Sequence, residues 1–233
     1  VVRCTGSLEL LSWTCCRSDV LPVALACGMS ELGVIFAAYL IGAIPFAYMV
    51  TRLRRGIDIR AVDIGNVGSG SVIRAVGLKE GLFVLAADIG KGSAAVMLAD
   101  YVDVGLYLVL AAGIAAILGH IYPAYIGFRG GQGVATAIGV FLVLSPLGMG
   151  LTLAVMGLVL LVTANREPSK RLFLADACGA PFLPLFVYVA ERSFILAAYA
   201  FAVVLLIGLR NLKRLQQPWS ITERLLEERE KRA

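Results

Sequence analysis

Seven apolar segments separated by short polar connections dominate this chain of 233 residues. A helix that crosses the hydrocarbon core of a bilayer needs about 20 predominantly apolar residues. A window of that length finds candidates at residues 32–52, 81–100, 104–122, 133–147, 149–164, 172–190 and 193–209. The sequence therefore predicts an all-α integral membrane protein with seven transmembrane helices. The fourth and fifth are short and split only by Ser145-Pro146-Leu147-Gly148, so they form either a tight helical hairpin or a partly re-entrant pair.

The composition excludes several classes of function. Apolar residues make up 59% of the chain and charged residues 16%, whereas soluble domains carry about 25% charged residues. We therefore expect no separate soluble catalytic domain, and any chemistry must use residues at the ends of the spans. The net charge of +5 comes from basic residues beside apolar segments, so it indicates topology and not nucleic-acid binding. The five cysteines form no C-x-x-C pair, and we infer neither a disulfide framework nor a zinc site.

Lysine and arginine are distributed unevenly between alternate connections. They follow the first, third, fifth and seventh spans, whereas the opposite connections hold Arg192 alone, with Asp100 and Asp103 in one turn. The positive-inside rule then predicts an outside N-terminus and a cytoplasmic C-terminus in a multi-pass protein of the inner (plasma) membrane. The cytoplasmic segments are residues 58–79, 119–136, 165–171 and 210–214. We expect them to converge on one site.

Three regions follow from this reading. Residues 1–28 are interpreted as an N-terminal extension upstream of a plausible start at Met29, the alternative being a genuine leader or an interfacial segment. Residues 29–215 form the seven-span domain. Residues 216–233 form a charged cytoplasmic tail, with pairs such as Glu227 and Lys231 at helical spacing.

The run GHIYPAYIGFRGGQGVAT at residues 119–136 combines glycines, an arginine and the only histidine of the chain between two apolar segments. Glycines allow main-chain N–H groups to converge on an anion, and Gly133 opens an apolar helix whose N-terminal end favours negative charge. This pattern predicts a phosphate or phosphate-like ligand at a membrane surface. For His120, a packing role and a role in the site both stay open.

A second polar segment, IDIRAVDIGNVGSGSVIRAVGLKEG, spans residues 57–81. It offers backbone and hydroxyl donors, and Arg74 has the planar fork that binds phosphate oxygens in pairs. The alternative is a solvated loop whose arginine only sets the topology. Asp88 and Lys91 follow inside a span, where an ionisable residue costs about 2.5–3.5 kcal/mol. Their i,i+3 spacing puts both on one helix face, as a structural ion pair or as part of a site.

Five stretches in this order resemble the bacterial acyl-phosphate:glycerol-3-phosphate acyltransferase family. The resemblance covers about residues 32–215. The stretches are YLIGAIPFAYMV, the Gly65-Asn66-x-Gly68 core with Arg74, DIGKG at 88–92, GHIYPAYIGFRGGQGVAT and NLKRL at 211–215. Membership would imply transfer of a fatty acyl group from acyl-phosphate to glycerol 3-phosphate. The products would be lysophosphatidic acid, used in phospholipid biosynthesis, and inorganic phosphate. No metal or other cofactor would be needed, and the partners would be the two substrates and the bilayer.

The candidate site residues follow from the resemblance and the residue types together. Arg74 and Asn211 are the candidate catalytic residues. The candidate substrate-binding residues are Asn66, Gly68, Ser69, Ser71, Lys91, His120, Arg129, Gly130, Gly131, Gln132 and Gly133.

Three positions depart from the family pattern. Ile64, Gln132 and Gly208 stand where the pattern has serine, lysine and histidine. Either Arg129, Ser69 and Ser71 compensate, or the protein is a catalytically impaired paralogue that binds acyl-phosphate or glycerol phosphate in a regulatory role. A transporter is a third reading, but the sequence lacks evident internal repeats or paired broken helices.

Overall fold

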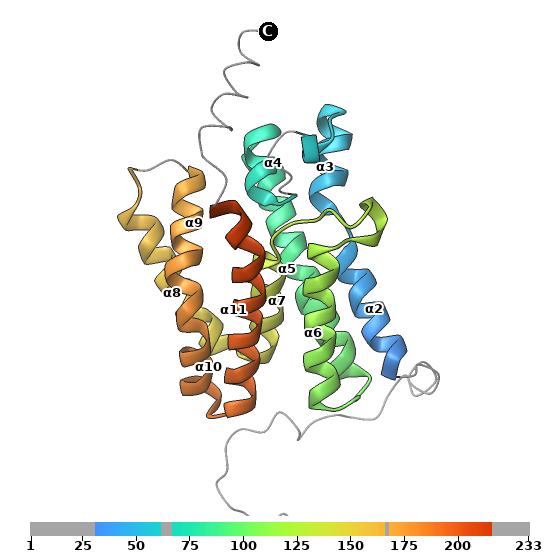
Figure 1. The fold of residues 1–233 in the computed structure, drawn as a ribbon, viewed down its shortest axis with the longest axis vertical. Helices are drawn as coiled ribbons and strands as arrows, with labels where there is room; N and C mark the ends of the chain where they lie inside the picture. The colour runs from blue at the N-terminus through green and yellow to red at the C-terminus, as the bar shows by residue number, and fades with distance from the viewer. Residues whose placement is uncertain (1–30, 62–66, 166–167, 216–233) are drawn as a thin grey trace, which may run out of the picture.

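The computed structural model describes residues 31–61, 67–165 and 168–215, which form a bundle of α-helices (Figure 1). The predicted extension at 1–28, the tail at 216–233, Asn66 and Ile64 lie outside these residues. The helices are α2 (Glu31–Ala43), α3 (Phe46–Arg55), α4 (Ser69–Ala75), α5 (Leu78–Tyr101), α6 (Leu106–Ile121), α7 (Val134–Leu144), α8 (Pro146–Val162), α9 (Pro168–Gly179), α10 (Leu183–Glu191) and α11 (Phe194–Leu215). Short 3-10 turns form η1 (Ile59–Ala61), η2 (Ala124–Ile126) and η3 (Ala180–Phe182).

The predicted all-α class is confirmed, and all seven apolar segments are helical. Within the described residues, five helical stretches are long and apolar enough to cross a membrane: residues 31–55, 78–101, 106–126, 174–191 and 194–211. The helices α7 and α8 are apolar but shorter. They are separated by Ser145 alone and run in opposite directions, which fits the predicted hairpin (Figure 1). The count of seven crossings and the orientation stay predictions.

The first predicted span, residues 32–52, is not one continuous helix. It breaks between α2 and α3 at Ile44-Pro45, and α3 continues to Arg55. The physical reason is Pro45, which has no N–H to donate to the carbonyl of Ile41 and whose ring clashes with a continuing helix. The predicted sixth span is also in pieces, α9, η3 and α10, with Pro181 in the connecting turn and Pro184 in the first turn of α10.

Small residues let the helices that carry the polar segments approach closely. A Cβ atom on Gly92 of α5 would meet the carbonyl of Thr136 on α7, and one on Gly139 of α7 would meet the backbone of Ile89. Ser93 adds a hydrogen bond of 2.8 Å to the carbonyl of Gly139. Glycine contacts of the same kind join α2 to α6. Such contacts are typical of helices that associate within membranes, where dispersion and interhelical hydrogen bonds replace the hydrophobic effect.

The predicted cytoplasmic segments gather at one end of the bundle, the upper end in Figure 1. The end of α3, helix α4, the segment from Tyr122 to Gly133, the start of α9 and the end of α11 all lie there. The α5–α6 turn, the α7–α8 junction and the α10–α11 connection lie at the other end. The fold thus brings together segments that are far apart in the sequence, as the topology argument predicted.

The close approach of α5 and α7 leads to a stability prediction. Gly92→Ala forces the two backbones apart and should destabilise the folded protein by about 1–3 kcal/mol, the usual cost of overpacking. Gly90→Ala is the matched control, because nothing lies within 4 Å of a Cβ at that position of the same helix. Thermal unfolding in detergent micelles measures the difference. Equal melting temperatures for the two variants would contradict the packing argument.

Candidate functional site

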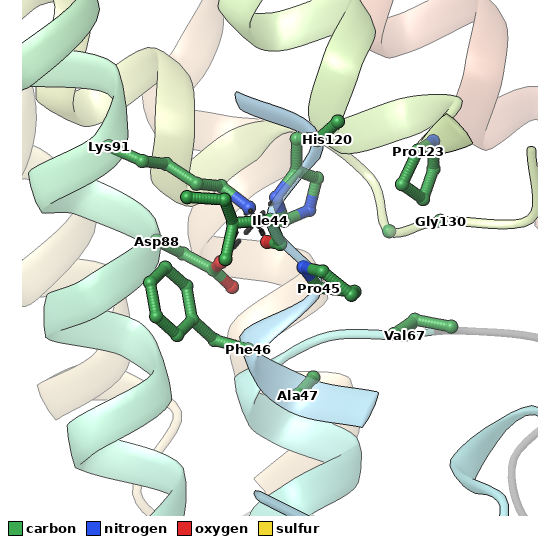
Figure 2. Close-up of a pocket in the computed structure, with 12 residues that line it drawn as sticks. Ile44, Pro45, Phe46, Ala47, Val67, Asp88, Lys91, His120, Pro123 and Gly130 are labelled. Carbon is green, nitrogen blue, oxygen red and sulfur yellow. Dashed lines mark hydrogen bonds and ion pairs between the residues drawn. The ribbon is translucent and has the colours of Figure 1, made fainter. Parts of the chain in front are cut away.

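A small pocket lies at the break between α2 and α3 (Figure 2). Its volume is ≈ 10 Å³, which is about the space that one water molecule needs. Its lining combines apolar residues of the break with three buried ionisable residues and two glycines. The lining residues are Ala43, Ile44, Pro45, Phe46, Ala47, Val67, Asp88, Lys91, His120, Pro123, Gly130 and Gly131.

Asp88 and Lys91 form the ion pair that their spacing predicted. Lys91 Nζ lies 2.8 Å from Asp88 Oδ1, and only 2% of Asp88 and 4% of Lys91 is exposed. Lys91 Nζ also donates a hydrogen bond of 3.0 Å to the carbonyl of Ile44, at the helix break. Removing one partner of such a buried pair typically costs about 3–5 kcal/mol, because the other charge is left uncompensated.

His120 packs beside this pair. Its Nδ1 faces Asp88 Oδ1 at 3.6 Å, just beyond hydrogen-bonding distance, and the residue is 7% exposed. The other edge of the ring faces Gly131, where a Cβ atom would meet both Nε2 of His120 and the carbonyl of Val67. Val67 belongs to the first polar segment and Gly131 to the second. The absence of a side chain at 131 therefore lets the two predicted segments touch.

The glycine-rich segment folds back on the end of α6. The N–H of Gly130 donates to the carbonyl of Ile121 at 3.1 Å, and that of Gly131 donates to the carbonyl of His120 at 3.2 Å. These two amides are thus engaged within the backbone, and the predicted role of both glycines in substrate binding stays a prediction. Gly133 has φ +90°, a left-handed conformation that favours glycine, and it is the N-terminal cap of α7. In the same segment, Arg129 is exposed and Gln132 is partly exposed.

The first polar segment continues from Val67 into the short helix α4. Gly68 is extended at its N-terminal cap and Ser69 is its first residue. Ser71 is buried, whereas Arg74 is exposed, and Arg74 Nη2 lies 3.4 Å from Ser71 Oγ. The candidate Asn66 lies outside the described residues of this segment.

Arg60 joins the two polar segments at the surface. Its guanidinium donates to both carboxylate oxygens of Asp58, with Nη2 2.6 Å from Oδ2, and to the carbonyl of Ile126 at 2.9 Å. It also lies 5.2 Å from the ring centre of Tyr48. The hydrogen bond from Arg60 holds the pKa of the Asp58 carboxyl below its usual range. The pair is therefore intact at neutral pH, and its contribution is lost only as the pH falls through that lowered pKa.

Tyr122 joins the end of α11 to the second polar segment. Tyr39 donates a hydrogen bond of 2.7 Å to the carbonyl of Tyr122, and the Arg210 guanidinium lies 5.5 Å from the centre of its ring. The neighbouring Asn211 has a buried side-chain oxygen, and no donor among the described residues lies within hydrogen-bonding distance of it. An unsatisfied buried acceptor is costly, so this oxygen is suited to a hydroxyl or amine of a ligand.

The pocket unites four of the predicted site residues, Lys91, His120, Gly130 and Gly131. Arg74, Arg129, Gln132 and Asn211 lie outside its lining. Sequence reasoning missed the part played by Ile44, Arg60 and Tyr122. Only the first had a signal, because Pro45 follows it inside an apolar helix pattern.

Comparison with known proteins gives one family. The family model described as glycerol-3-phosphate acyltransferase matches residues 32–218. A glycerol-3-phosphate acyltransferase of Syntrophotalea carbinolica is 41% identical over 184 residues, which are 78% of this chain and 91% of that protein. One of Geobacter sulfurreducens is 34% identical over 192 residues, covering 81% of this chain and 95% of that protein.

Solved structures agree with the sequence matches. The crystal structure of PlsY, an integral membrane glycerol 3-phosphate acyltransferase, in its glycerol 3-phosphate form aligns with a TM-score of 0.68 at 32% identity. The alignment covers 85% of this chain and 93% of that chain. The lysophosphatidic acid form of PlsY gives the same TM-score at 30% identity.

The Arg60 contacts lead to a prediction about local order. Arg60→Ala removes the link between Asp58 and the Ile126 carbonyl, so amide hydrogen exchange should accelerate in residues 57–61 and 124–128. Arg52→Ala is the control, because Arg52 donates to the carbonyl of Gly56 near its own helix end. Exchange followed by mass spectrometry measures both. Unchanged exchange at 124–128 in Arg60→Ala would show that the segments are held by other contacts.

Proposed function

The chain belongs to the glycerol-3-phosphate acyltransferase family, and we propose that it transfers a fatty acyl group from acyl-phosphate to glycerol 3-phosphate. In this reaction the acceptor hydroxyl oxygen bonds to the acyl carbonyl carbon, the bond from that carbon to the phosphate oxygen breaks, and the hydroxyl proton is transferred to the departing phosphate. The products are lysophosphatidic acid and inorganic phosphate. Because acyl-phosphate is already activated, positioning and charge stabilisation can supply much of the rate.

The observation that carries the proposal is the meeting of Val67 and Gly131 at one end of an apolar helical bundle. Both substrates carry phosphate, and the segments on either side of this contact carry exposed cations at Arg74 and Arg129. One substrate also carries a fatty chain, which the spans can admit from the bilayer. A site with backbone and cationic groups at the membrane surface and an apolar bundle beside it suits this substrate pair.

Roles for the candidate residues follow from their positions. We assign phosphate binding to Arg74, with Ser69 and Ser71 on the same short helix, and to Arg129 with Gln132 and Gly133. Asn66 and Gly68 would complete the first segment. Asn211 would align a substrate hydroxyl through its buried side-chain oxygen. Gly130 and Gly131 would serve by close packing, because their amides donate to carbonyls of α6.

Arg74 gives a direct test of the reaction. Purified protein with acyl-phosphate and radiolabelled glycerol 3-phosphate should form lysophosphatidic acid, and Arg74→Ala should lower kcat/KM by about 10²–10³-fold, the usual cost of one preorganised donor. Acyl-coenzyme A in place of acyl-phosphate should give no product. Arg54→Ala is the control, because Arg54 is exposed at the same end, with Glu80 3.6 Å away. Saturable binding of glycerol 3-phosphate without product would favour the regulatory alternative.

Gly208 gives a second, gain-of-function test. This glycine stands where the family pattern has histidine, and nothing lies within 4 Å of a Cβ at this position. Gly208→His should therefore fold normally and raise kcat/KM by about tenfold or more, since a positioned imidazole is an effective proton-transfer group. Gly208→Ala controls for the change in helix propensity. A folded Gly208→His variant with unchanged kcat/KM would mean that this chain's site works without that group.

A further inference from the structure

The buried pair of Asp88 and Lys91 is not explained by stability alone. Both residues lie inside a candidate span with 2% and 4% exposure. Apolar residues of similar volume often replace such a pair without loss of stability, because the desolvation of two charges offsets their attraction. Lys91 Nζ also donates a hydrogen bond to the carbonyl of Ile44. Two apolar residues in place of Asp88 and Lys91 would not reproduce this bond.

That carbonyl lies where the helix is interrupted. The N–H of Ile44 turns back to the carbonyl of Ile41 at 3.3 Å, and the N–H of Phe46 turns back to the carbonyl of Ile44 at 3.2 Å. The regular i to i+4 pattern resumes only with Met49, which donates to Pro45. Lys91 therefore adds a cationic donor from the neighbouring helix α5 to a backbone that has lost its regular bonds. Its ammonium group also lies 5.9 Å from the ring centre of Phe46.

The break in turn supports both polar segments. Phe46 and Ala47 pack in an apolar cluster with Val67 of the first segment and Ile126 of the second. Pro45 lines the pocket together with Gly130 and Gly131 (Figure 2). Asp88, which also lines the pocket, faces His120, whose ring packs against Gly131. A movement of the break would therefore move the contact between the two segments.

We propose that Lys91 and Asp88 are positioning residues for acyl transfer, which hold the helix break at Ile44 and thereby the contact between Val67 and Gly131. The proposal rests on the function proposed above. It gives Lys91 a different role from direct substrate binding. Two of the three hydrogens of its ammonium group are directed to Asp88 and to the Ile44 carbonyl, inside the bundle. A displacement of about 1 Å in a catalytic constellation can cost 10²-fold in rate.

The deciding experiment compares one single and one double variant. Lys91→Met leaves Asp88 buried without its partner and should lower the melting temperature. Asp88→Leu/Lys91→Met removes both charges, so its melting temperature should return toward that of the wild type. In both variants the Ile44 carbonyl loses the donor from Lys91 and keeps only the N–H of Phe46. We expect amide exchange at Phe46, Gly130 and Gly131 to accelerate at least tenfold and kcat/KM to fall about 10- to 100-fold.

Ser93→Ala is the matched control. Ser93 is on the same helix and also donates to a backbone carbonyl, that of Gly139, but away from the break. It should leave the exchange of Gly130 and Gly131 and the kcat/KM unchanged. Lys91→Arg keeps a cation beside Asp88 and should recover activity only if it also restores the slow exchange at Phe46.

Each outcome decides the proposal. A stable double variant with wild-type kcat/KM would overturn it, and so would wild-type exchange at Gly130 and Gly131. Fast exchange together with the loss of kcat/KM in a stable double variant supports it. If the wild type itself forms no product, the proposed function fails. The exchange rates and the affinity for glycerol 3-phosphate then decide on the positioning role, with unchanged affinity in the double variant overturning it.

Discussion

The structure depends on the pairing of backbone groups that leave a helix inside the bundle, and the peptide carbonyl of Ile44 is the example. Inside an apolar bundle no water is available, so a backbone group that leaves a helix must find its partner within the protein. Pro45 interrupts the first helix, and the carbonyl of Ile44, which accepts from the N–H of Phe46, receives a second donor from Lys91, 47 residues further along the chain. A buried lysine needs a counter-ion, which is Asp88 one helical turn before it. Two charged residues in the middle of another helix thus lie beside the interruption at Pro45.

Helix α5 transmits this arrangement to the rest of the site because neighbouring residues on it face different partners. Lys91 contacts the break between α2 and α3, whereas Gly92 packs against Thr136 on α7 and Ser93 bonds to Gly139. The start of α7 is also the end of the glycine-rich segment. The distance between the helix break and that segment therefore depends on Lys91 and Gly92, two consecutive residues of α5. Close packing through glycine makes the spacing rigid, since there is no side chain to change rotamer.

Local patterns in the sequence predicted the features that depend on local structure. The apolar segments became helices, the division at Ser145-Pro146 lies where it was expected, and Asp88 pairs with Lys91 at i,i+3. The side-chain donors to the carbonyls of Ile44 and Ile126 were not predicted. Every residue has the same backbone carbonyl, so the sequence does not show which one accepts a hydrogen bond from a distant side chain. The amides of Gly130 and Gly131 donate to carbonyls of α6, a pairing that the sequence did not predict, and the role of these glycines in substrate binding stays a prediction. The glycine pattern indicates that another group lies close to this backbone, but it does not show whether that group is a ligand or another part of the protein.

The proposed reaction requires positively charged side chains near the phosphate groups of its two substrates. Acyl-phosphate and glycerol 3-phosphate each carry a phosphate, and two such groups repel one another unless cations lie near both. Lys91 does not meet that demand, because Asp88 already neutralises it inside the bundle. Arg60 is engaged with Asp58 and the carbonyl of Ile126. Arg74, Lys79 and Arg129 are the exposed cations of the two polar segments. Within the proposed function, Arg129, three residues before Gln132 in the same segment, would supply a charge that this glutamine lacks.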